Sequence, residues 1–242
     1  FLNFYDEIKI KKITGKNHKI EFFGNFSKGI KKNNTIYNLL KILDEKKILK
    51  NQKYLIKIKK NIPQKAGLGG GSMNASTVIR FFISKKVINF SKKDLIKLTK
   101  QIGSDVQLGI DNKNKILYSN GKLEAKSKQK RLFVILVKPN FGCSTKEIYK
   151  DVRIFSKPVF KKNQKVNINQ KFLLNLSNDL ELSAFKKYST LTKLKKFMEK
   201  LDNVLFARMT GSGSTMVAYF KSKKAAVNAR KILKKKYKNY WC

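Results

Sequence analysis

The sequence predicts an α+β protein with two lobes that meet at a cleft, and three observations lead to this prediction. First, β-like and helix-like segments follow one another in mixed order along the chain. Second, 242 residues with 41% hydrophobic content provide enough apolar side chains for one large core or two modest ones. Third, the polar and charged stretch Lys126–Arg131 divides the chain, so we expect domains over residues 1–128 and 129–242.

Three strands and one helix are expected in the first part of the chain. Asp6–Ile10 opens a strand, Lys19–Gly24 is its expected partner, and Tyr54–Lys59 alternates in the same way. His18, the one histidine, lies in the expected hairpin loop among Lys and Asn, and we expect it to be solvated rather than catalytic. Asn34–Ile42 predicts a helix because four apolar side chains share one face: Ile36, Leu39, Leu40 and Leu43.

A further helix and a hairpin complete the first lobe. Ser91 is a good N-cap with an acid three residues later, and Gly103 is expected to end the helix that Ser91 starts. Lys115–Ser119 and Lys122–Glu124 flank an Asn-Gly pair that is typical of a primed turn, so they predict a hairpin. The apolar face of the helix is expected to carry Leu95, Ile96, Leu98 and Ile102.

The second lobe is expected to begin with the apolar, β-rich run Leu132–Val137 as a buried strand. Val204–Ala207 and Met216–Phe220 are two further β-like runs. Ser189–Leu201 and Lys223–Tyr237 have the apolar spacing of amphipathic helices. The inward positions of the last helix are expected to be Ala226, Ala229, Ile232 and Leu233.

The most informative stretch is Pro63–Thr77, which reads Pro-Gln-Lys-Ala-Gly-Leu-Gly-Gly-Gly-Ser-Met-Asn-Ala-Ser-Thr. Its glycines and Ser72 precede a helix expected over Asn74–Ile83. Glycine lets the backbone approach an anion closely, and the N–H groups and dipole of a helix N-terminus attract phosphate. Ser72 can cap that helix or bind the phosphate or its metal. The alternative is a glycine-rich loop without a ligand. The spacing fits neither a Walker P-loop nor a dinucleotide fingerprint.

Two other stretches carry candidate chemistry. Asp105 follows a helix-ending Gly-Ser, and a carboxylate on such a turn can accept a proton in phosphoryl transfer. An Asp in a turn is also common without any catalytic role. Met209–Thr215 holds a Gly-Ser-Gly-Ser turn between two β-like runs, which indicates either close backbone approach to a ligand or a flexible connection. Ser144 begins a capping box before Tyr149.

These stretches together resemble one family. Pro-x-x-Ala-Gly-Leu-Gly-Gly-Gly-Ser-x-Asn-Ala is similar to the ATP-binding loop of the GHMP kinases, and its triple glycine followed by Ser-x-Asn-Ala resembles the 4-diphosphocytidyl-2-C-methyl-D-erythritol kinases of isoprenoid (terpenoid) synthesis. Gly-Ser-Asp-Val around Asp105 resembles the family's Gly-x-Asp-Val-Pro, and Met209–Thr215 its C-terminal glycine motif. The resemblance extends from about Asp6 to about Tyr219. It implies a ribosomal-protein-S5-like first lobe and a ferredoxin-like second lobe.

The resemblance implies transfer of the ATP γ-phosphate to the 2-hydroxyl of 4-diphosphocytidyl-2-C-methyl-D-erythritol, with Mg²⁺ accompanying ATP. Asp105 is the implied catalytic residue, and no residue is assigned as a metal ligand. Tyr149 matches an aromatic that stacks on cytosine, although it can instead be a helix core residue. The implied ATP-binding residues are Pro63, Ala66, Gly67, Leu68, Gly69, Gly70, Gly71, Ser72 and Asn74. The implied substrate-binding residues, besides Tyr149, are Thr210, Gly211, Ser212, Gly213 and Ser214.

The sequence departs from the family at several positions. Gln107 replaces the family's Pro, and Met73 replaces a usual second serine. The family's Lys in an opening strand and its His-containing segment, both expected before Asp6, are not present. The chain does not begin with Met, and we expect it to be a fragment shortened at both ends. As it stands we expect it to be poorly active or inactive, although the full-length protein is a kinase.

The composition leaves two rival functions open. A net charge of +41 raises nucleic acid or an anionic membrane as a partner, but lysine is spread through every segment and arginine is rare, which favours compositional bias. The rivals are a GHMP kinase acting on homoserine or mevalonate and a basic RNA-binding module.

No apolar run reaches the length of about 18 residues that a membrane span needs. Two distant cysteines suit a reducing cytoplasm and give no zinc site, so we expect a cytoplasmic protein. Its expected oligomeric state is a monomer or homodimer.

Overall fold

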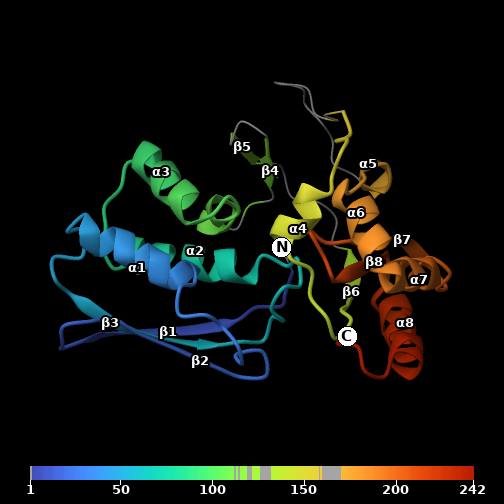
Figure 1. Cartoon of the computed structure of the whole chain (residues 1–242), viewed down its shortest axis with the longest axis horizontal. Helices are drawn as coiled ribbons and strands as arrows, with labels where there is room; N and C mark the ends of the chain where they lie inside the picture. The colour runs from blue at the N-terminus through green and yellow to red at the C-terminus, as the bar shows by residue number, and fades with distance from the viewer. Residues whose placement is uncertain are drawn as a thin grey trace. The chain divides into compact units, whose positions relative to one another are not determined.

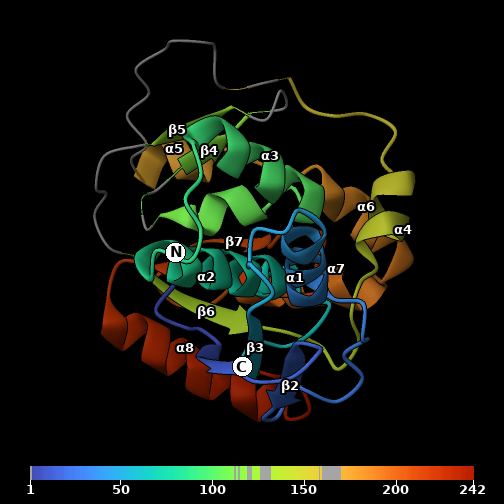
Figure 2. The same ribbon diagram turned by 90° about the vertical axis from the view of Figure 1, so that its left-hand side faces the viewer.

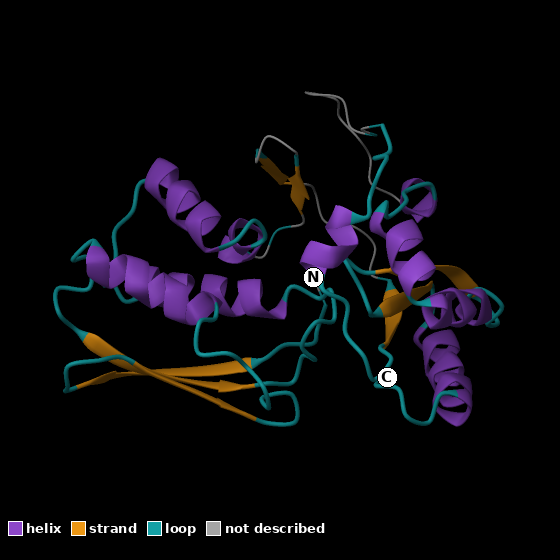
Figure 3. Ribbon diagram, viewed as in Figure 1, coloured by secondary structure: helices purple, strands orange, loops and turns teal. Residues whose placement is uncertain are grey.

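A computed structural model describes residues 2–111, 113, 115–118, 122–125, 132–157, 159 and 170–242. The chain divides into two compact units. Unit 1 comprises Phe1–Gln64 and Gly69–Ser127, and unit 2 comprises Lys65–Leu68 and Lys128–Cys242. Both units mix helices and strands, as the α+β prediction requires (Figure 3).

The sheet of unit 1 contains β1 (Glu7–Ile13), β2 (Lys19–Phe23) and β3 (Lys53–Lys59) in the order β1-β3-β2. β3 pairs antiparallel with β1 and parallel with β2, so the predicted β1–β2 hairpin is wrong. The physical reason is burial. β3 supplies three side chains that are at most 3% exposed, and a central strand keeps such a row away from solvent. These side chains are Tyr54, Ile56 and Ile58.

Helices cover one face of this sheet in unit 1. α1 (Thr35–Glu45) and α2 (Gly70–Ser84) lie directly on the sheet, and α3 (Lys92–Ile102) lies over them, an order of layers that both views show (Figures 1 and 2). The 3₁₀ helix η1 (Val106–Ile110) follows α3. The core between sheet and helices includes all four residues predicted for the inner face of α1. β4 (Lys115–Leu117) and β5 (Leu123–Ala125) form the predicted antiparallel hairpin.

The local signals at the helix ends are largely confirmed. Ser91 caps α3 as predicted by accepting from Asp94 N, whereas Asn34, predicted as the first residue of a helix, instead caps α1 by accepting from the N–H groups of Ile36 and Tyr37. α3 ends where Gly103 follows, but Gly103 has φ of 168°, which is extended backbone rather than a left-handed cap. Ile96 is 37% exposed, so it does not belong to the buried face of α3 as predicted.

His18 is placed differently from the prediction. Its side chain is only 10% exposed, so it is not solvated. The ring accepts a hydrogen bond from Tyr54 N through Nδ1, and Nε2 lies 3.2 Å from Asp44 Oδ2. Burial lowers the pKa of His18, and the neighbouring Asp44 carboxylate opposes that shift. The residue therefore ties the start of β2 to β3 and α1.

Unit 2 contains a three-stranded antiparallel sheet of β6 (Phe133–Val137), β7 (Val204–Met209) and β8 (Met216–Phe220) in the order β6-β8-β7. α7 (Ser189–Met198) and α8 (Lys223–Lys236) lie on the same side of this sheet (Figure 1). The short helices α4 (Thr145–Lys150), α5 (Gln170–Leu174) and α6 (Leu180–Lys187) complete the unit. In α8 the predicted inward residues are buried except Ile232, which is 44% exposed.

Some predictions fall on residues outside the described ranges. These are the boundary at Lys126–Arg131 and the Asn-Gly turn of the β4–β5 hairpin. Among the helices that the structure describes, none combines the length and apolar character needed to cross a membrane.

Candidate functional site

The glycine loop of unit 1 leads into α2 earlier than predicted. The helix starts at Gly70 rather than Asn74, and its N-cap is Gly69 in the left-handed conformation with φ of 65°. No side chain caps this helix, so Ser72 is not the cap that the sequence allowed. The first residues of a helix have N–H groups without intrahelical partners, and these point out along the axis with the positive end of the dipole. Gly70, Gly71 and Ser72 therefore form a helix start whose N–H groups can attract an anion.

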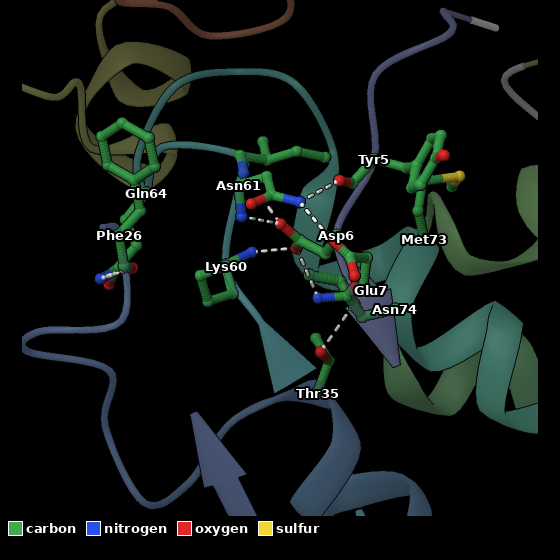
Figure 4. Close-up of polar contacts among 12 residues, drawn as sticks. Tyr5, Asp6, Glu7, Phe26, Thr35, Lys60, Asn61, Gln64, Met73 and Asn74 are labelled. Atoms are coloured by element: carbon green, nitrogen blue, oxygen red, sulfur yellow. Dashed lines mark hydrogen bonds and ion pairs between the residues drawn. The ribbon is translucent and has the colours of Figure 1, made fainter. Parts of the chain in front are cut away.

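The loop is anchored to its surroundings on both sides. The Thr35 hydroxyl donates to Gly71 O at 2.9 Å, and the Asn74 amide donates to Asp6 Oδ2 at 2.8 Å (Figure 4). A Cβ on Gly70 would come within 3.1 Å of the Ile62 side chain, which fixes how closely the helix start packs on the segment before the loop. These anchors were not predicted, because Asp6 was assigned only to a strand.

Asp105 lies on the exposed turn that leads into η1. η1 packs on α2, where the Ser76 hydroxyl donates to Val106 O at 2.6 Å. A Cβ on Gly109 would come within 2.6 Å of Ser76 Oγ, so only glycine allows this approach. The candidate catalytic carboxylate is thus held in a turn fixed against the helix that starts at the glycine loop. Sequence reasoning missed Ser76 and Gly109, whose only signal is their small size.

Gln107, which stands where the family has Pro, is buried in η1. Its Oε1 has no hydrogen-bond partner within the described part of the chain. The residue nevertheless keeps the 3₁₀ turn, since Val106 N donates to Gly103 O and Leu108 N to Asp105 O. The replacement of Pro therefore leaves the backbone turn that presents Asp105 intact.

The first half of the glycine loop, Lys65–Leu68, belongs to unit 2 and contacts the second glycine loop. Thr210 Oγ1 donates to Gly67 O at 2.7 Å, and Thr215 N donates to Ala66 O at 3.3 Å. Gly67 has φ of +69°, and a Cβ there would lie 2.2 Å from Thr210 O. Both loops were predicted to be ligand loops, but their contact was not predicted. Pro63, which precedes this segment, is buried in unit 1.

Internal hydrogen bonds fix the second loop, Thr210–Thr215. Ser212 and Ser214 are buried, and their hydroxyls bond to Thr145 Oγ1 at 2.8 Å and Phe141 O at 2.6 Å. The Asn178 amide donates to both Met209 O and Gly211 O, at 2.9 and 2.8 Å. Gly211, at the tip, is exposed. The two serines thus shape the loop, whereas the tip backbone faces solvent.

Tyr149 is 53% exposed on α4, while its neighbour Ile148 is fully buried. The alternative that Tyr149 is a helix core residue is therefore wrong. An exposed aromatic ring on a short, capped helix can stack on a planar ligand. Ser144 caps α4 as predicted by accepting from Glu147 N.

Burial shifts two ionisable groups behind the second loop. Burial lowers the pKa of Lys138, whose ammonium donates to Pro139 O and Phe141 O. Burial also raises the pKa of the Cys143 thiol, which keeps it protonated and unsuited to nucleophilic attack. Within the described residues no group of three or more His, Cys, Asp or Glu is arranged to hold a metal ion.

Comparisons with known proteins agree with this arrangement. Residues 34–119 match the family described as GHMP kinases N terminal domain, and residues 158–239 match GHMP kinases C terminal. A 4-diphosphocytidyl-2-C-methyl-D-erythritol kinase from Pelagibacter ubique (strain HTCC1062) is 50% identical over 242 residues, which cover 100% of this chain and 86% of that protein. The chain belongs to the 4-diphosphocytidyl-2-C-methyl-D-erythritol kinase family of GHMP kinases. It is accordingly an ATP-dependent phosphotransferase.

More distant members and solved structures support the same family and fold. A kinase of this name from Clostridium perfringens (strain 13 / Type A) is 32% identical over 98% of this chain and 84% of that protein. A crystal structure of 4-(cytidine 5'-diphospho)-2C-methyl-D-erythritol kinase has a TM-score of 0.70 at 22% identity, covering 95% of this chain and 82% of that one. L. major mevalonate kinase has a TM-score of 0.68 at 17% identity, covering 99% and 86%. These structures show the GHMP kinase fold, while the sequence relatives show the family.

Proposed function

We propose that this protein transfers the γ-phosphate of ATP to the 2-hydroxyl of 4-diphosphocytidyl-2-C-methyl-D-erythritol, a step of isoprenoid biosynthesis. The observation that carries the proposal is the arrangement in unit 1. A helix start with free N–H groups at Gly70–Ser72 and the turn of Asp105 are both fixed on α2. The acceptor is assigned from the sequence relatives, since the fold alone is shared with mevalonate kinase.

In the proposed reaction Asp105 accepts the proton of the 2-hydroxyl as its oxygen attacks the γ-phosphorus. The new bond joins that oxygen to phosphorus, and the bond from phosphorus to the β–γ bridging oxygen breaks to release ADP. The helix start binds the phosphates through backbone N–H groups, as part of an ATP site formed by the glycine-loop residues predicted above. Tyr149 stacks on the cytosine, and the backbone of Thr210–Ser214 shapes the acceptor side.

Mg²⁺ is proposed to accompany ATP. Magnesium prefers hard oxygen ligands, keeps several waters, and is commonly held by one or two protein groups together with the substrate phosphates. The Ser72 hydroxyl on the first turn of α2 fits one such ligand position, because it does not cap the helix. The ion would supply charge neutralisation between the phosphates.

Further properties are proposed from coarser observations. We propose the two domains to be residues 1–128, which bind ATP, and residues 129–242. We also propose a cytoplasmic location, supported by the two cysteines that the structure leaves unpaired and by the use of ATP. The protein is proposed to act as a monomer or homodimer.

The test is turnover by the full-length protein with ATP and each of three acceptors: the diphosphocytidyl substrate, homoserine and mevalonate. We expect turnover with the first alone. Asp105→Asn is expected to lower kcat by about 10²- to 10⁴-fold, the usual contribution of a general base, with unchanged ATP affinity in calorimetry.

Asp111→Asn is the matched control, because it removes a carboxylate just beyond η1 that pairs with Lys115. It should leave kcat within about twofold, the size of effect expected away from the chemistry. Turnover of homoserine or mevalonate instead would overturn the acceptor but keep the kinase. Salt-dependent RNA binding that ATP does not disturb, without turnover of any acceptor, would favour the RNA-binding alternative.

A further inference from the structure

The carboxylate of Asp6 makes polar contacts with four other residues in unit 1. It is fully buried and accepts hydrogen bonds from Asn61 N and Ile62 N, each at 2.8 Å. It also accepts from Asn74 Nδ2 at 2.8 Å and forms an ion pair with the Lys60 ammonium. Figure 4 shows these donors converging on one carboxylate from two separate segments. A carboxylate has about four acceptor sites, so this one is saturated.

The two segments are the two stems of the glycine loop. Lys60, Asn61 and Ile62 directly precede Pro63, where the loop begins, and Asn74 follows the first turn of α2. Asp6 itself is the residue just before β1 and lies far from both stems in sequence. One side chain thus joins the chain entering the loop to the chain leaving it. Since the loop's glycines permit many backbone conformations, closing its two ends removes much of that freedom before any ligand binds.

The ion pair with Lys60 explains why a neutral side chain at position 6 could not replace the Asp6 carboxylate. Lys60 is 7% exposed and Asp6 is 0% exposed, so neither charge is solvated. Removing one partner of a buried pair leaves the other charge uncompensated. A carboxylate is also acceptor-only, whereas an amide in its place would direct N–H groups at the Lys60 ammonium or the Asn74 amide. A carboxylate is therefore needed at this position to accept from all these donors at once.

We propose that Asp6 is a positioning residue for ATP: it closes the neck of the glycine loop and holds the start of α2 in its phosphate-binding conformation. Asp6 does not contact the nucleotide in this proposal. The inference rests on the proposed ATP-binding role of the glycine loop and adds the residue on which the loop's shape depends. A distortion of about 1 Å at a binding element can lower its effectiveness by about 100-fold.

The experiment compares wild-type full-length enzyme with Asp6→Asn, measuring the Kd of ATP by calorimetry and the KM of each substrate. We expect the Kd and KM of ATP to rise by about 10- to 100-fold, while the KM of the diphosphocytidyl acceptor stays within about twofold. A merely structural role would reduce the amount of folded enzyme, which lowers the maximal rate but leaves both KM values unchanged. The melting temperature of each variant is recorded in parallel.

Three further variants sharpen the result. Glu21→Gln is the matched control, since Glu21 pairs with Lys57 on the same sheet but both side chains are about half exposed. It should leave the KM of ATP unchanged. The exchange Asp6→Asn with Asn74→Asp restores a carboxylate and an amide across the neck, and should recover at least part of the ATP affinity. If Asp6→Asn does not fold, Asp6→Glu keeps the charge beside Lys60 while displacing the carboxylate by one methylene, with the same expected rise.

The outcomes separate this inference from the proposed function. Wild-type enzyme that does not bind ATP would contradict the proposed function itself. Wild-type enzyme that binds ATP, with folded Asp6→Asn or Asp6→Glu showing the same Kd, would overturn the role of Asp6 alone. A weakened ATP affinity that the exchange variant recovers would support the role and exclude general damage to the fold.

Discussion

The glycine loop at Gly69–Gly71 leads into a helix, whereas the glycine loop at Thr210–Thr215 leads into the strand β8. In the first loop the stems are joined by the buried carboxylate of Asp6, and the glycines themselves form the helix start. In the second loop neutral hydroxyl and amide groups bond to the loop and its carbonyl oxygens. The first loop therefore leads into the N–H groups of a helix start, which can attract an anion, whereas the second loop leads into a strand.

The comparison teaches that glycine density does not by itself identify a phosphate site. Where the second loop meets Gly67 of the first loop, glycine is needed for close packing of protein on protein, because a Cβ on Gly67 would lie 2.2 Å from Thr210 O and one on Gly213 would lie 2.7 Å from Met209 Sδ. In the first loop Gly69 takes a left-handed conformation, and a Cβ added to it would meet nothing within 4 Å, so its space is open. Glycine thus serves packing where the two loops meet and access at the start of α2.

The largest expected effect tests that distinction directly. Gly67 and Gly69 have nearly the same φ, +69° and +65°, so alanine costs similar backbone strain at both, about 1–2 kcal/mol. Gly67→Ala also places a methyl group 2.2 Å from Thr210 O, which should add about 1–3 kcal/mol of overpacking. Chemical denaturation should therefore show a clearly larger loss of unfolding free energy for Gly67→Ala. Equal losses in the two variants would break the comparison.

A smaller effect is expected where η1 packs on α2. Gly109→Ala should push η1, and with it Asp105, away from α2, because the new Cβ would lie 2.6 Å from Ser76 Oγ. We expect kcat to fall by about 10-fold or more with little change in the KM of ATP. Gly103→Ala is the control, since its Cβ would meet only Val106 at 3.7 Å. A Gly109→Ala enzyme with normal kcat would show that the Asp105 turn does not depend on this contact.

The smallest expected effect is the pH dependence of stability that His18 gives to unit 1. The one histidine of the chain, His18, lies in unit 1, and burial lowers its pKa below the ordinary value of 6.5. At a pH between the lowered pKa and the ordinary pKa, His18 binds a proton in the unfolded chain but not in the folded chain. The free energy of unfolding should therefore fall as the pH drops through 6.5 toward the folded-state pKa.

His18→Gln should remove that part of the pH dependence, which denaturation at pH 8 and at acidic pH would measure. Gln keeps an acceptor for Tyr54 N but does not titrate. If wild-type and variant lose stability in parallel as the pH falls, the histidine is not responsible. A steeper loss in the variant would also contradict the prediction.

Much of the local structure could be predicted because its signals lie close together in the chain. Asn34, Ser91 and Ser144 cap helices through donors two or three residues away, and the inner face of α1 follows from helical spacing. The exception at Ile232 shows the limit of spacing. Ile232 was predicted among the inward positions of α8, yet it is 44% exposed while the other three are buried.

The candidate site was predicted in its parts but not in its assembly. The glycine loop and Asp105 were identified from residue types in order, and the structure brings Asp105 to the same helix through Ser76 and Gly109. The start of α2 was predicted four residues late, because Gly70, Gly71 and Ser72 have low helix propensity. Their early helical turn is stabilised by anchors that are distant in sequence, such as Thr35.

The sequence by itself determined the α+β class, most helix ends, the glycine-loop chemistry and the family. Only the tertiary structure decided that β3 lies between β1 and β2, that Asp6 joins the stems of the loop, and that Gly67 packs on Thr210. The physical reason is sequence separation. Asp6 and Asn74 are 68 residues apart, and Gly67 and Thr210 are 143 apart. Such pairs leave no periodic signal in the sequence, because their contacts form only when distant segments come together in the folded chain.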